Sequence, residues 1–476
     1  MKDLTTEGSK SNDSGVTFNK IIALCNARGF IFAGSSIYGG LANTWDYGPL
    51  GVELKNNIKR EWWKYFVQEC RQSVGMDGGI LMNPNVWVAS GHVGGFSDPL
   101  MDCKACKTRH RADHLAEGAG LQAMQNGCKV HVDALSQAEL EELVFSNKVP
   151  CPHCAKVDWT GIRQFNLMFK TFRGVVEDSS STIYLRPETA QSQFVNFQNL
   201  QRTSRMKLPF GVGQIGKAFR NEITPGNFTF RTIEFEQAEY QHFCRAEESM
   251  AAYESFKSRA MEFYIKRLGL AKGKLRFRDH AVLCHYAKAA VDAEFNFVGD
   301  WWGEVGGTHH RGQHDLGGHQ AHSRSSQEYV DSATGEKFLP TVVESSHGVD
   351  RLTLAVLCNG YEEEQLAEDD VRVVLRIKPS IAPYKVAVLP LQKKGLTEKS
   401  DEVFAMLSKQ FMCTYDETGS IGKRYRRQDE IGTPLCVTID YETLEDGCVT
   451  VRERDSMKQK RVKISALVKY VGKYLS

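Results

Sequence analysis

Two strand-like stretches on either side of a short turn constrain the fold more than any other feature of the sequence. They read GQIGKAFRNE and FRTIEFEQAEY, within residues 213–240, and Thr-Pro-Gly-Asn lies between them. Polar and apolar side chains alternate along the second stretch, and Pro-Gly-Asn favours a reversal of the chain. We therefore predict an antiparallel β-hairpin at this point.

The charges of this hairpin raise the question of what they contact. Strand alternation places Ile233, Phe235 and Gln237 on one face, and Glu239 follows on the same face. An unpaired carboxylate is very costly to bury, so a cation should meet Glu239, and a ligand ammonium group is one candidate. A solvated charged face is the alternative that the segment alone leaves open.

The composition is that of a globular protein that meets polyanions through local patches. Of 476 residues, 41% are hydrophobic and 25% are charged, and the formal net charge is +2, so we expect two to four domains without a global positive field.

No apolar run reaches the roughly 18 residues that a membrane span needs. Residues 1–15 lack an apolar leader and are predicted to be a disordered tail. Thirteen cysteines without a secretory signal indicate a reducing compartment, so we predict a cytoplasmic protein with no membrane partner.

The rest of the sequence divides into a long first domain, a module inserted in it, and a smaller C-terminal domain. We assign residues 16–380 to the first domain, with the insertion at about 100–165, and residues 381–476 to the second. The Pro-containing connector KPSIAPYK marks the boundary, because it follows a β-branched strand. Alternating strand and helix patterns beyond it predict a small α/β domain.

One helix of the first domain is strongly amphipathic. Within ELKNNIKREWWKYFVQE, Leu54, Ile58, Trp62 and Phe66 recur at every fourth residue, and a turn is predicted just before, at Asp46 to Gly51. This apolar face must pack against something large.

Two Cys-x-x-Cys pairs lie in the insertion, formed by Cys103, Cys106, Cys151 and Cys154. Four thiolates in this pattern predict a structural zinc site, which has no open coordination position. The segment between the pairs is long for a zinc ribbon, but it contains SQAELEEL, a predicted helix start with a capping box, and can absorb the length. Reduced or redox-labile thiols are the alternative.

Two further segments carry charges beside apolar runs. In YLRPETAQ, Pro187 is placed to start a helix, which would put Glu188 in the first turn. In VVESSHGVDRLTLAVL, Glu344 ends one apolar run and Arg351 begins another. Charged residues at such borders either pair internally or face a cleft.

Together these segments resemble the class II aminoacyl-tRNA synthetases, and within them the dimeric glycyl-tRNA synthetases. The resemblance begins at about residue 16 and rests on motifs in family order: GGLANTWDYGPLGVELKNNIKREWW, NPNVWVASGHVGGFSDPL, RADHL, LRPETAQ, FRNE, FEQAEY, ESSHGVDR and IGKRYRRQDEIGTP. It implies an α+β fold, with a central antiparallel sheet flanked by helices, a zinc-type insertion and a C-terminal α/β anticodon-binding domain.

The resemblance also implies an ATP site. Arg220 would hold the α-phosphate and the substrate carboxylate, and Arg351 would hold the γ-phosphate; these two are the predicted catalytic residues. Glu304 would contact ATP through Mg²⁺, and an aromatic ring would stack on the adenine. The full predicted ATP set is Arg220, Asn221, Glu222, Phe230, Arg231, Thr232, Phe235, Glu304, Val305, Gly348, Val349, Asp350 and Arg351.

A glycine pocket is implied next to the ATP site. Carboxylates would surround the glycine ammonium, and two arginines would complete the pocket. The full predicted glycine set is Arg111, Glu188, Phe235, Glu236, Gln237, Glu239, Arg311, Glu344, Ser346 and Gly348. No smaller amino acid competes with glycine, so a tight pocket can exclude the others by overlap, and no editing domain is expected.

The implied reaction has two steps and no protein nucleophile. The glycine carboxylate attacks the α-phosphorus of ATP and releases pyrophosphate, and the glycyl group then passes to the terminal ribose of tRNA(Gly). Catalysis would consist of positioning and charge stabilisation.

The implied partners are tRNA(Gly) and a second copy of the chain. Residues 38–100 would form much of a two-fold dimer interface, with which the Trp62 face of the amphipathic helix is consistent. The basic run GKRYRRQDE would lie in the anticodon-binding domain, although such a run by itself is usually a solvated surface.

Some positions depart from the family pattern. Ser345 stands where the family has proline, Ile233 stands where it has arginine, and Ser192-Gln193 replaces Gly-Ile. A non-catalytic, nucleic-acid-binding accessory protein on the same scaffold is therefore the alternative function. Such a protein should have lost the phosphate-binding arginines or the ammonium-binding glutamates, and this chain keeps both.

The segment GTHHRGQHDL departs most, although Arg311 and Asp315 stay in register. It opens a histidine-rich tract at residues 309–322. These imidazoles could converge on a transition metal, or they could be ordinary loop side chains near the ATP site.

Overall fold

The computed structural model describes residues 17–121, 123–125, 128–130, 132, 135–223, 226–280 and 288–475. The predicted tail at residues 1–15 and the Thr224-Pro225 part of the predicted turn lie outside this range. Among the helices in the described part of the chain, none combines the length and the apolar character needed to span a membrane.

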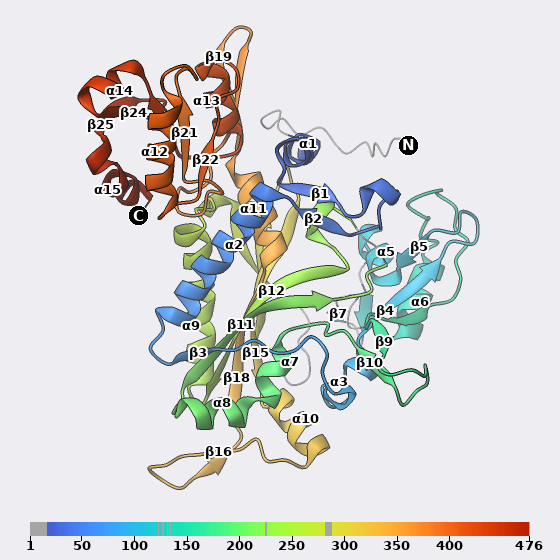
Figure 1. Ribbon diagram of the computed structural model, residues 1–476. Coiled ribbons are helices and arrows are strands. Elements are labelled where there is room, and N and C mark those ends of the chain that lie inside the picture. The colour runs from blue at the N-terminus through green and yellow to red at the C-terminus, as the bar shows by residue number, and fades with distance from the viewer. Residues whose placement is uncertain are drawn as a thin grey trace.

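A seven-stranded sheet forms the centre of the first domain (Figure 1). Its strands are β3 (Ser73–Gly75), β11 (Phe210–Phe219), β12 (Glu234–Cys244), β13 (Leu275–Asp279), β14 (Ala290–Asn296), β15 (Trp302–Gly312) and β18 (Thr341–Gly348). They lie in the order β13-β14-β15-β18-β12-β11-β3, and every neighbouring pair is antiparallel except β11 and β3. The predicted hairpin is confirmed, because β11 pairs with β12 from end to end.

Helices cover both faces of this sheet. On one face, the main core joins the sheet to α1 (Phe18–Arg28), α2 (Pro49–Trp63), α9 (Ser249–Glu262) and α11 (Val349–Gly360). On the other, a smaller core joins it to α7 (Ala190–Val195), α8 (Phe197–Ser204) and α10 (His314–Ser323). Neighbouring residues of β18 show the division, since Val343 belongs to the main core and Val342 to the smaller one.

The amphipathic helix packs as predicted but begins earlier. Leu54, Ile58 and Trp62 are buried in the main core, as is Phe66 in the π-helical turn that follows. The turn expected at Asp46 to Gly51 is wrong, because β2 (Trp45–Tyr47) leads directly into α2, whose first residue is a proline, a favourable choice at that position. The apolar face is buried within its own chain, so it gives no support to a dimer interface.

The insertion folds around its own small core. A sheet in the order β5-β4-β8 packs with two helices, and Figure 1 shows this module and the C-terminal domain on different sides of the central sheet. The elements are β4 (Ser97–Asp102), β5 (Arg109–Arg111), α5 (Ala112–Gly118), β6 (Ala123–Gln125), β7 (Cys128–Val130), α6 (Gln137–Ser146) and β8 (Arg163–Asn166). The predicted capping box of Ser136 and Glu139 at the start of α6 is confirmed.

The C-terminal domain is an α/β unit, as predicted, with a mixed five-stranded sheet in the order β22-β21-β23-β24-β25. Its elements are β21 (Val386–Pro390), α12 (Thr397–Ser408), β22 (Cys413–Tyr415), α13 (Ile421–Glu430), β23 (Leu435–Ile439), α14 (Tyr441–Asp446), β24 (Cys448–Glu453), β25 (Gln459–Lys463) and α15 (Ile464–Leu475). A separate hydrophobic core fills it.

The remaining helices and strands lie before the C-terminal domain: β1 (Ile31–Ala33), α3 (Pro84–Ala89), α4 (His92–Gly95), β9 (Lys170–Phe172), β10 (Thr182–Tyr184), β16 (Tyr329–Val330), β17 (Lys337–Phe338), β19 (Tyr361–Ala367) and β20 (Asp370–Leu375).

Candidate active site

A cavity of about 350 Å³ lies against β12, β15 and β18 in the centre of the sheet. The pairing of these strands sets Glu239 and Gly307 opposite Ser346, and His309 opposite Glu344. A cavity of this size suits a small ligand.

Most of the predicted site residues line this cavity. They are Glu188, Arg220, Glu222, Phe230, Arg231, Thr232, Phe235, Glu236, Gln237, Glu239, Glu304, Arg311, Glu344, Ser346, Gly348, Asp350 and Arg351. Segments far apart in the sequence therefore meet at one place, as the charged borders of the apolar runs suggested.

Three predicted ATP residues lie outside the lining. The side chains of Val305, on β15, and Val349, the first residue of α11, are buried in the main core. Asn221 lies just beyond β11, where its backbone amide donates to the carbonyl of Leu167. Contact of these three residues with ATP stays a prediction.

Arg111, predicted to complete the glycine pocket, does not line the cavity either. It is on β5 of the insertion, and its guanidinium pairs with Asp98 at 3.1 Å and with Asp113 at 2.5 Å. Burial would lower its pKa, but these carboxylates and the more distant Glu222 raise it. Two acidic residues of its own module thus pair with Arg111 in this structure.

The carboxylates of Glu188, Glu239 and Glu344 lie in the part of the cavity that Arg311 lines. The guanidinium of Arg311 donates to Glu344 at 3.0 Å, lies 3.8 Å from Glu188, and is held by Asp315 through bonds of 2.8 and 2.9 Å. More negative than positive groups therefore gather here.

Glu239 is the least compensated member of this cluster. Its carboxylate accepts a hydrogen bond from the hydroxyl of Thr189, and it forms no ion pair with any residue that the structure describes. Burial and the charges of Glu344 and Glu188 raise the pKa of Glu239 to about 8.

The other two glutamates behave in the opposite way. Burial alone would raise the pKa of Glu188, but His92 and Arg311 outweigh it and lower that pKa. Burial is likewise outweighed at Glu344, whose pKa is lowered by Arg311 and by a hydrogen bond from His309. These two remain anionic, and their charges act on Glu239.

Two glutamines, which the sequence analysis missed, hold the cluster in place. Gln191 donates to Glu188 and to Asp315, each at 2.9 Å, and Gln241 donates to Glu344 at 2.6 Å. A signal existed for Gln241, which continues the strand alternation two residues after Glu239.

Pro187 does not start a helix, contrary to prediction. Helix α7 begins at Ala190, and Glu188 precedes it. The carbonyls of Arg186 and Pro187 accept hydrogen bonds from the amide of Phe219 and from Arg220, which hold this stretch beside the end of β11.

The two predicted catalytic arginines differ in their surroundings. Arg220 lies between the rings of Phe96 and Phe235, at 5.2 and 5.3 Å, and makes no ion pair within the described ranges. Arg351 lies 4.4 Å from the centre of the Phe230 ring and pairs with Glu304 at 2.8 Å. Arg220 thus has free donors, whereas Arg351 is already paired.

Glu236 and Asp350 border the cavity but turn their carboxylates to α2. Lys55 pairs with Asp350 at 2.6 Å and with Glu236 at 3.1 Å, and Lys59 pairs with Glu236 at 3.0 Å. These contacts lie on the opposite face of β12 from Glu239, as the alternation predicts. The Glu236 carboxylate is thus already paired in this structure, and its predicted contact with glycine stays a prediction.

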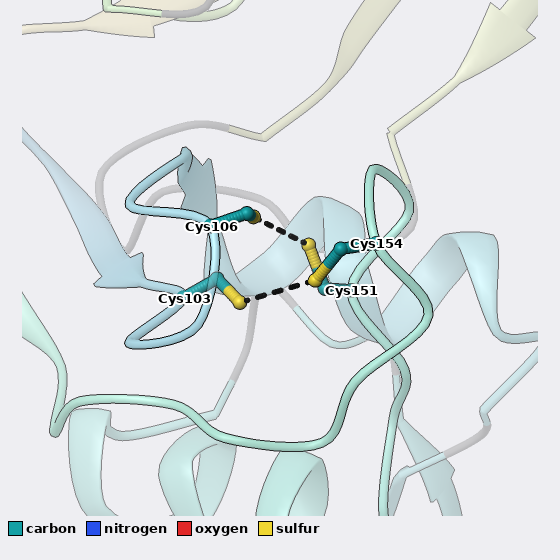
Figure 2. A group of neighbouring side chains, drawn as sticks. All are labelled: Cys103, Cys106, Cys151 and Cys154. Atoms are coloured by element: carbon teal, nitrogen blue, oxygen red, sulfur yellow. Dashed lines mark hydrogen bonds between the residues drawn. The ribbon is translucent and has the colours of Figure 1, made fainter.

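The four cysteines of the insertion converge (Figure 2). Their sulfur atoms all lie within 4.8 Å of one another, with Cys103 to Cys154 at 3.6 Å and Cys106 to Cys151 at 3.7 Å. Thiolates about 2.3 Å from a tetrahedral zinc ion would be roughly 3.8 Å apart, so the observed arrangement fits Zn²⁺.

The histidine-rich tract does not form a loop, contrary to one expectation. His309 and His310 belong to β15, and His314, His319 and His322 belong to α10. His310 bonds to the hydroxyl of Ser249, and His319 bonds to Gln191. Strand and helix geometry thus points these imidazoles at different neighbours.

Comparisons with known proteins agree with this geometry. Residues 171–360 match the tRNA synthetase class II core domain (G, H, P, S and T), and residues 385–474 match the anticodon binding domain. The glycine–tRNA ligase of Ruminiclostridium cellulolyticum is 56% identical over 95% of this chain and 97% of its own length. Those of Clostridium perfringens and Bacillus thuringiensis subsp. konkukian are 55% and 54% identical over 96% of this chain, and cover 98% and 99% of their own lengths. The chain belongs to the glycine–tRNA ligase family of class II aminoacyl-tRNA synthetases.

Proposed function

We propose that this chain activates glycine with ATP in the central cavity, releases pyrophosphate, and transfers the glycyl group to the terminal ribose of tRNA(Gly). The observation that carries the proposal is the cluster of three glutamates around Arg311, in which Glu239 has no cation among its described neighbours. A buried carboxylate in this state is suited to receive a ligand cation. Such a cluster also argues against the accessory-protein alternative.

The glycine ammonium would lie among Glu188, Glu239 and Glu344. An ammonium group offers three donors, and these carboxylates provide acceptors on different sides of the cavity. Arg311 keeps Glu188 and Glu344 in place, which leaves Glu239 as the group whose charge the ligand neutralises.

The phosphates of ATP would lie toward Arg220 and Arg351. Arg220 has its Nε bound to the carbonyl of Pro187 at 3.1 Å, which leaves its terminal nitrogens for an α-phosphate oxygen and the substrate carboxylate. Arg351 would exchange its pairing with Glu304 for a γ-phosphate. Both guanidinium groups would stabilise charge as the glycine carboxylate oxygen bonds to the α-phosphorus and pyrophosphate leaves.

Two metals belong to the proposal. Glu304 is a half-exposed carboxylate on the cavity wall and would hold Mg²⁺, which neutralises phosphate charge when it is bound with ATP. The four cysteines of the insertion would hold Zn²⁺ as a structural ion, since their thiolates fill all four positions.

The macromolecular partners are proposed as tRNA(Gly) and a second copy of the chain. Ile37 and Tyr38 are 86% and 85% exposed, and Leu41 is 61% exposed, so an apolar patch beside residues 38–100 is open to a partner. In the C-terminal domain, Arg424 donates to the carbonyl of Leu391 at 3.1 Å and is buried, so it supports the fold, whereas the exposed Lys423 is available to RNA. The cytoplasmic location stays a prediction.

ATP–pyrophosphate exchange tests the activation step. The purified protein should support exchange with glycine and much less with alanine or serine, and Glu239→Gln and Arg220→Ala should abolish it. Glu234→Gln is the matched control, because Glu234 is a half-exposed residue of the same strand that pairs with Lys217. Absence of exchange with every amino acid in folded protein would favour the accessory-protein alternative.

A further inference from the structure

We propose that His280, Asp292 and His309 form a second metal site, which binds a divalent transition-metal ion such as Zn²⁺ at the wall of the central cavity. One candidate ligand atom from each residue lies within 4.8 Å of the other two. The site does not rest on the way in which glycine or ATP binds.

Three adjacent strands deliver these side chains to one place. His280 follows the last residue of β13, and its amide donates to the carbonyl of Ala290 on β14 at 3.1 Å. Ala290 in turn lies opposite His309 on β15, while Asp292 lies opposite Gly307. The rings of His280 and His309 are edge to face, with centroids 5.8 Å apart.

Gly307 provides the space that His309 needs. A Cβ atom at this position would lie 2.4 Å from Cε1 of His309. Because Gly307 has none, the imidazole folds over the strand and comes to lie beside Asp292, the cross-strand neighbour of Gly307. The local backbone thus brings the two ligands together.

Two imidazoles and one carboxylate make a donor set that zinc favours. Sites with three protein ligands keep a fourth position open for water or another ligand. Nε2 of His280 now lies 2.7 Å from Asp292 Oδ1, which is a hydrogen bond. Ligands about 2.1 Å from a tetrahedral ion lie roughly 3.4 Å apart, so a metal ion would replace the shared proton after a shift of a few tenths of an ångström.

Glu344 prepares His309 for metal binding. Its carboxylate oxygen lies 2.9 Å from Nδ1 of His309, close enough to accept a hydrogen bond from that nitrogen. The proton of a neutral imidazole therefore stays on Nδ1, and Nε2 keeps its lone pair. A carboxylate behind a histidine in this way is the usual support for a metal ligand.

Arg278 competes for Asp292 but has a second partner. Arg278 lies 2.9 Å from Asp292, but its Nε also pairs with Glu294 at 2.8 Å, and its side chain is 55% exposed. Arg278 can therefore stay on Glu294 when a metal ion takes Asp292.

The open position of the ion would face the cavity. His280 and His309 both line the cavity, whereas Asp292 is buried behind them. The site would therefore take water or an anionic oxygen, unlike the four-cysteine cluster, which has no free position.

Zinc titration of the full-length, reduced, metal-stripped protein against a chromophoric chelator tests the proposal. The wild type should bind one more equivalent than His309→Ala, or bind that equivalent at least about tenfold more tightly. Asp292→Asn should show the same loss of zinc binding. Agreement between the two variants would show that the loss comes from the missing ligand and not from a local disturbance caused by the alanine. His322→Ala, an exposed histidine of the same tract, should bind zinc as the wild type does.

Cobalt(II) separates this site from the cysteine cluster. Cobalt bound in the second site should show no sulfur-to-cobalt charge transfer. The part of the spectrum that comes from this site should disappear in His309→Ala, while circular dichroism shows that the variant keeps a native fold. Equal zinc binding by the wild type, His309→Ala and Asp292→Asn would overturn the proposal, as would an equal loss in His322→Ala.

Discussion

Two clusters of buried charge in this chain differ in how completely their charges are neutralised. In the C-terminal domain, Asp429 is 0% exposed and accepts hydrogen bonds from Arg372 at 2.9 Å and from Arg452 at 2.8 and 3.0 Å. In the central cavity, Glu239 is 3% exposed and accepts one from Thr189, with no cation among the described residues. The two carboxylates are equally buried, but only Asp429 has a cation partner.

This difference distinguishes a carboxylate that stabilises the fold from one that is available to bind a ligand cation. A buried ion pair with every lone pair satisfied is self-contained, and removal of one member leaves an uncompensated charge. A buried carboxylate beside other carboxylates has an unfavourable energy that only an incoming cation relieves. Removal of a buried carboxylate is thus expected to have opposite outcomes at the two sites.

The largest expected effect is on stability, at Asp429. Asp429→Asn leaves Arg372 and Arg452 without their shared carboxylate, so the free energy of unfolding should fall by about 3–5 kcal/mol. Urea unfolding of the full-length protein measures it, since Arg372 belongs to β20, outside the C-terminal domain. Glycine-dependent exchange by the folded fraction should persist, and a stability loss below about 1 kcal/mol would remove the distinction between the two clusters.

The next effect is on activity, at Glu239. Glu239→Gln removes the proposed ammonium partner, so kcat/KM for glycine should fall by about 100-fold or more, the size seen when one partner of a buried charge pair is truncated. The free energy of unfolding should not fall, because glutamine is neutral at every pH and the anionic Glu188 and Glu344 cannot repel it. Glu234→Gln should change kcat/KM by less than about twofold; a loss of stability with unchanged activity in Glu239→Gln would reverse the assignment.

The dependence of stability on pH sharpens the comparison. The pKa of Glu239 is raised from 4.5 to about 8, so the folded state binds more protons than the unfolded state between these values. The contribution of Glu239 to the free energy of unfolding is therefore fully present below about pH 4.5. It is lost as the pH rises toward 8, by up to about 1.4 kcal/mol per pH unit. In Glu239→Gln the fall should be absent; an equal fall in both proteins would show that another group titrates.

The smallest expected effect is on stability, at the uncharged side chain of Gln193. Gln193 stands where the family has isoleucine, and both amide atoms of its buried side chain lack a partner among the described residues. Gln193→Met keeps the shape and removes the unsatisfied amide, so the free energy of unfolding should rise by about 1 kcal/mol, with glycine activation unchanged. A drop in stability on thermal or urea unfolding would mean that the amide has a partner.

Local patterns predicted the parts of the fold that depend on neighbouring residues. Strand alternation placed Glu239 and Glu236 on opposite faces of β12, and in the structure Lys55 and Lys59 pair with Glu236 and not with Glu239. The spacing of the cysteine pairs predicted their convergence, which the sulfur positions confirm.

Contacts between distant segments could not be predicted in this way. The hydrogen bonds that hold Arg186 and Pro187 in place come from Phe219, at the end of β11, and from Arg220 just after it, so helix propensity at Pro187 was misleading. The pairing of Arg111 with Asp98 within the insertion was likewise hidden in the sequence. The resemblance gave the residue set of the site, but not which carboxylate lacks a cation.

The most direct test of the role of Glu239 is the number of protons released when glycine binds. Calorimetric titration near pH 7 in buffers of different ionisation enthalpy measures it. Glu239, with a pKa of about 8, is protonated there and must ionise to receive an ammonium, so close to one proton should leave per glycine bound, in the wild type and in Glu234→Gln. If glycine binds the wild type without proton release, or if Glu239→Gln binds glycine equally well and releases as many protons, the ammonium is not received by Glu239.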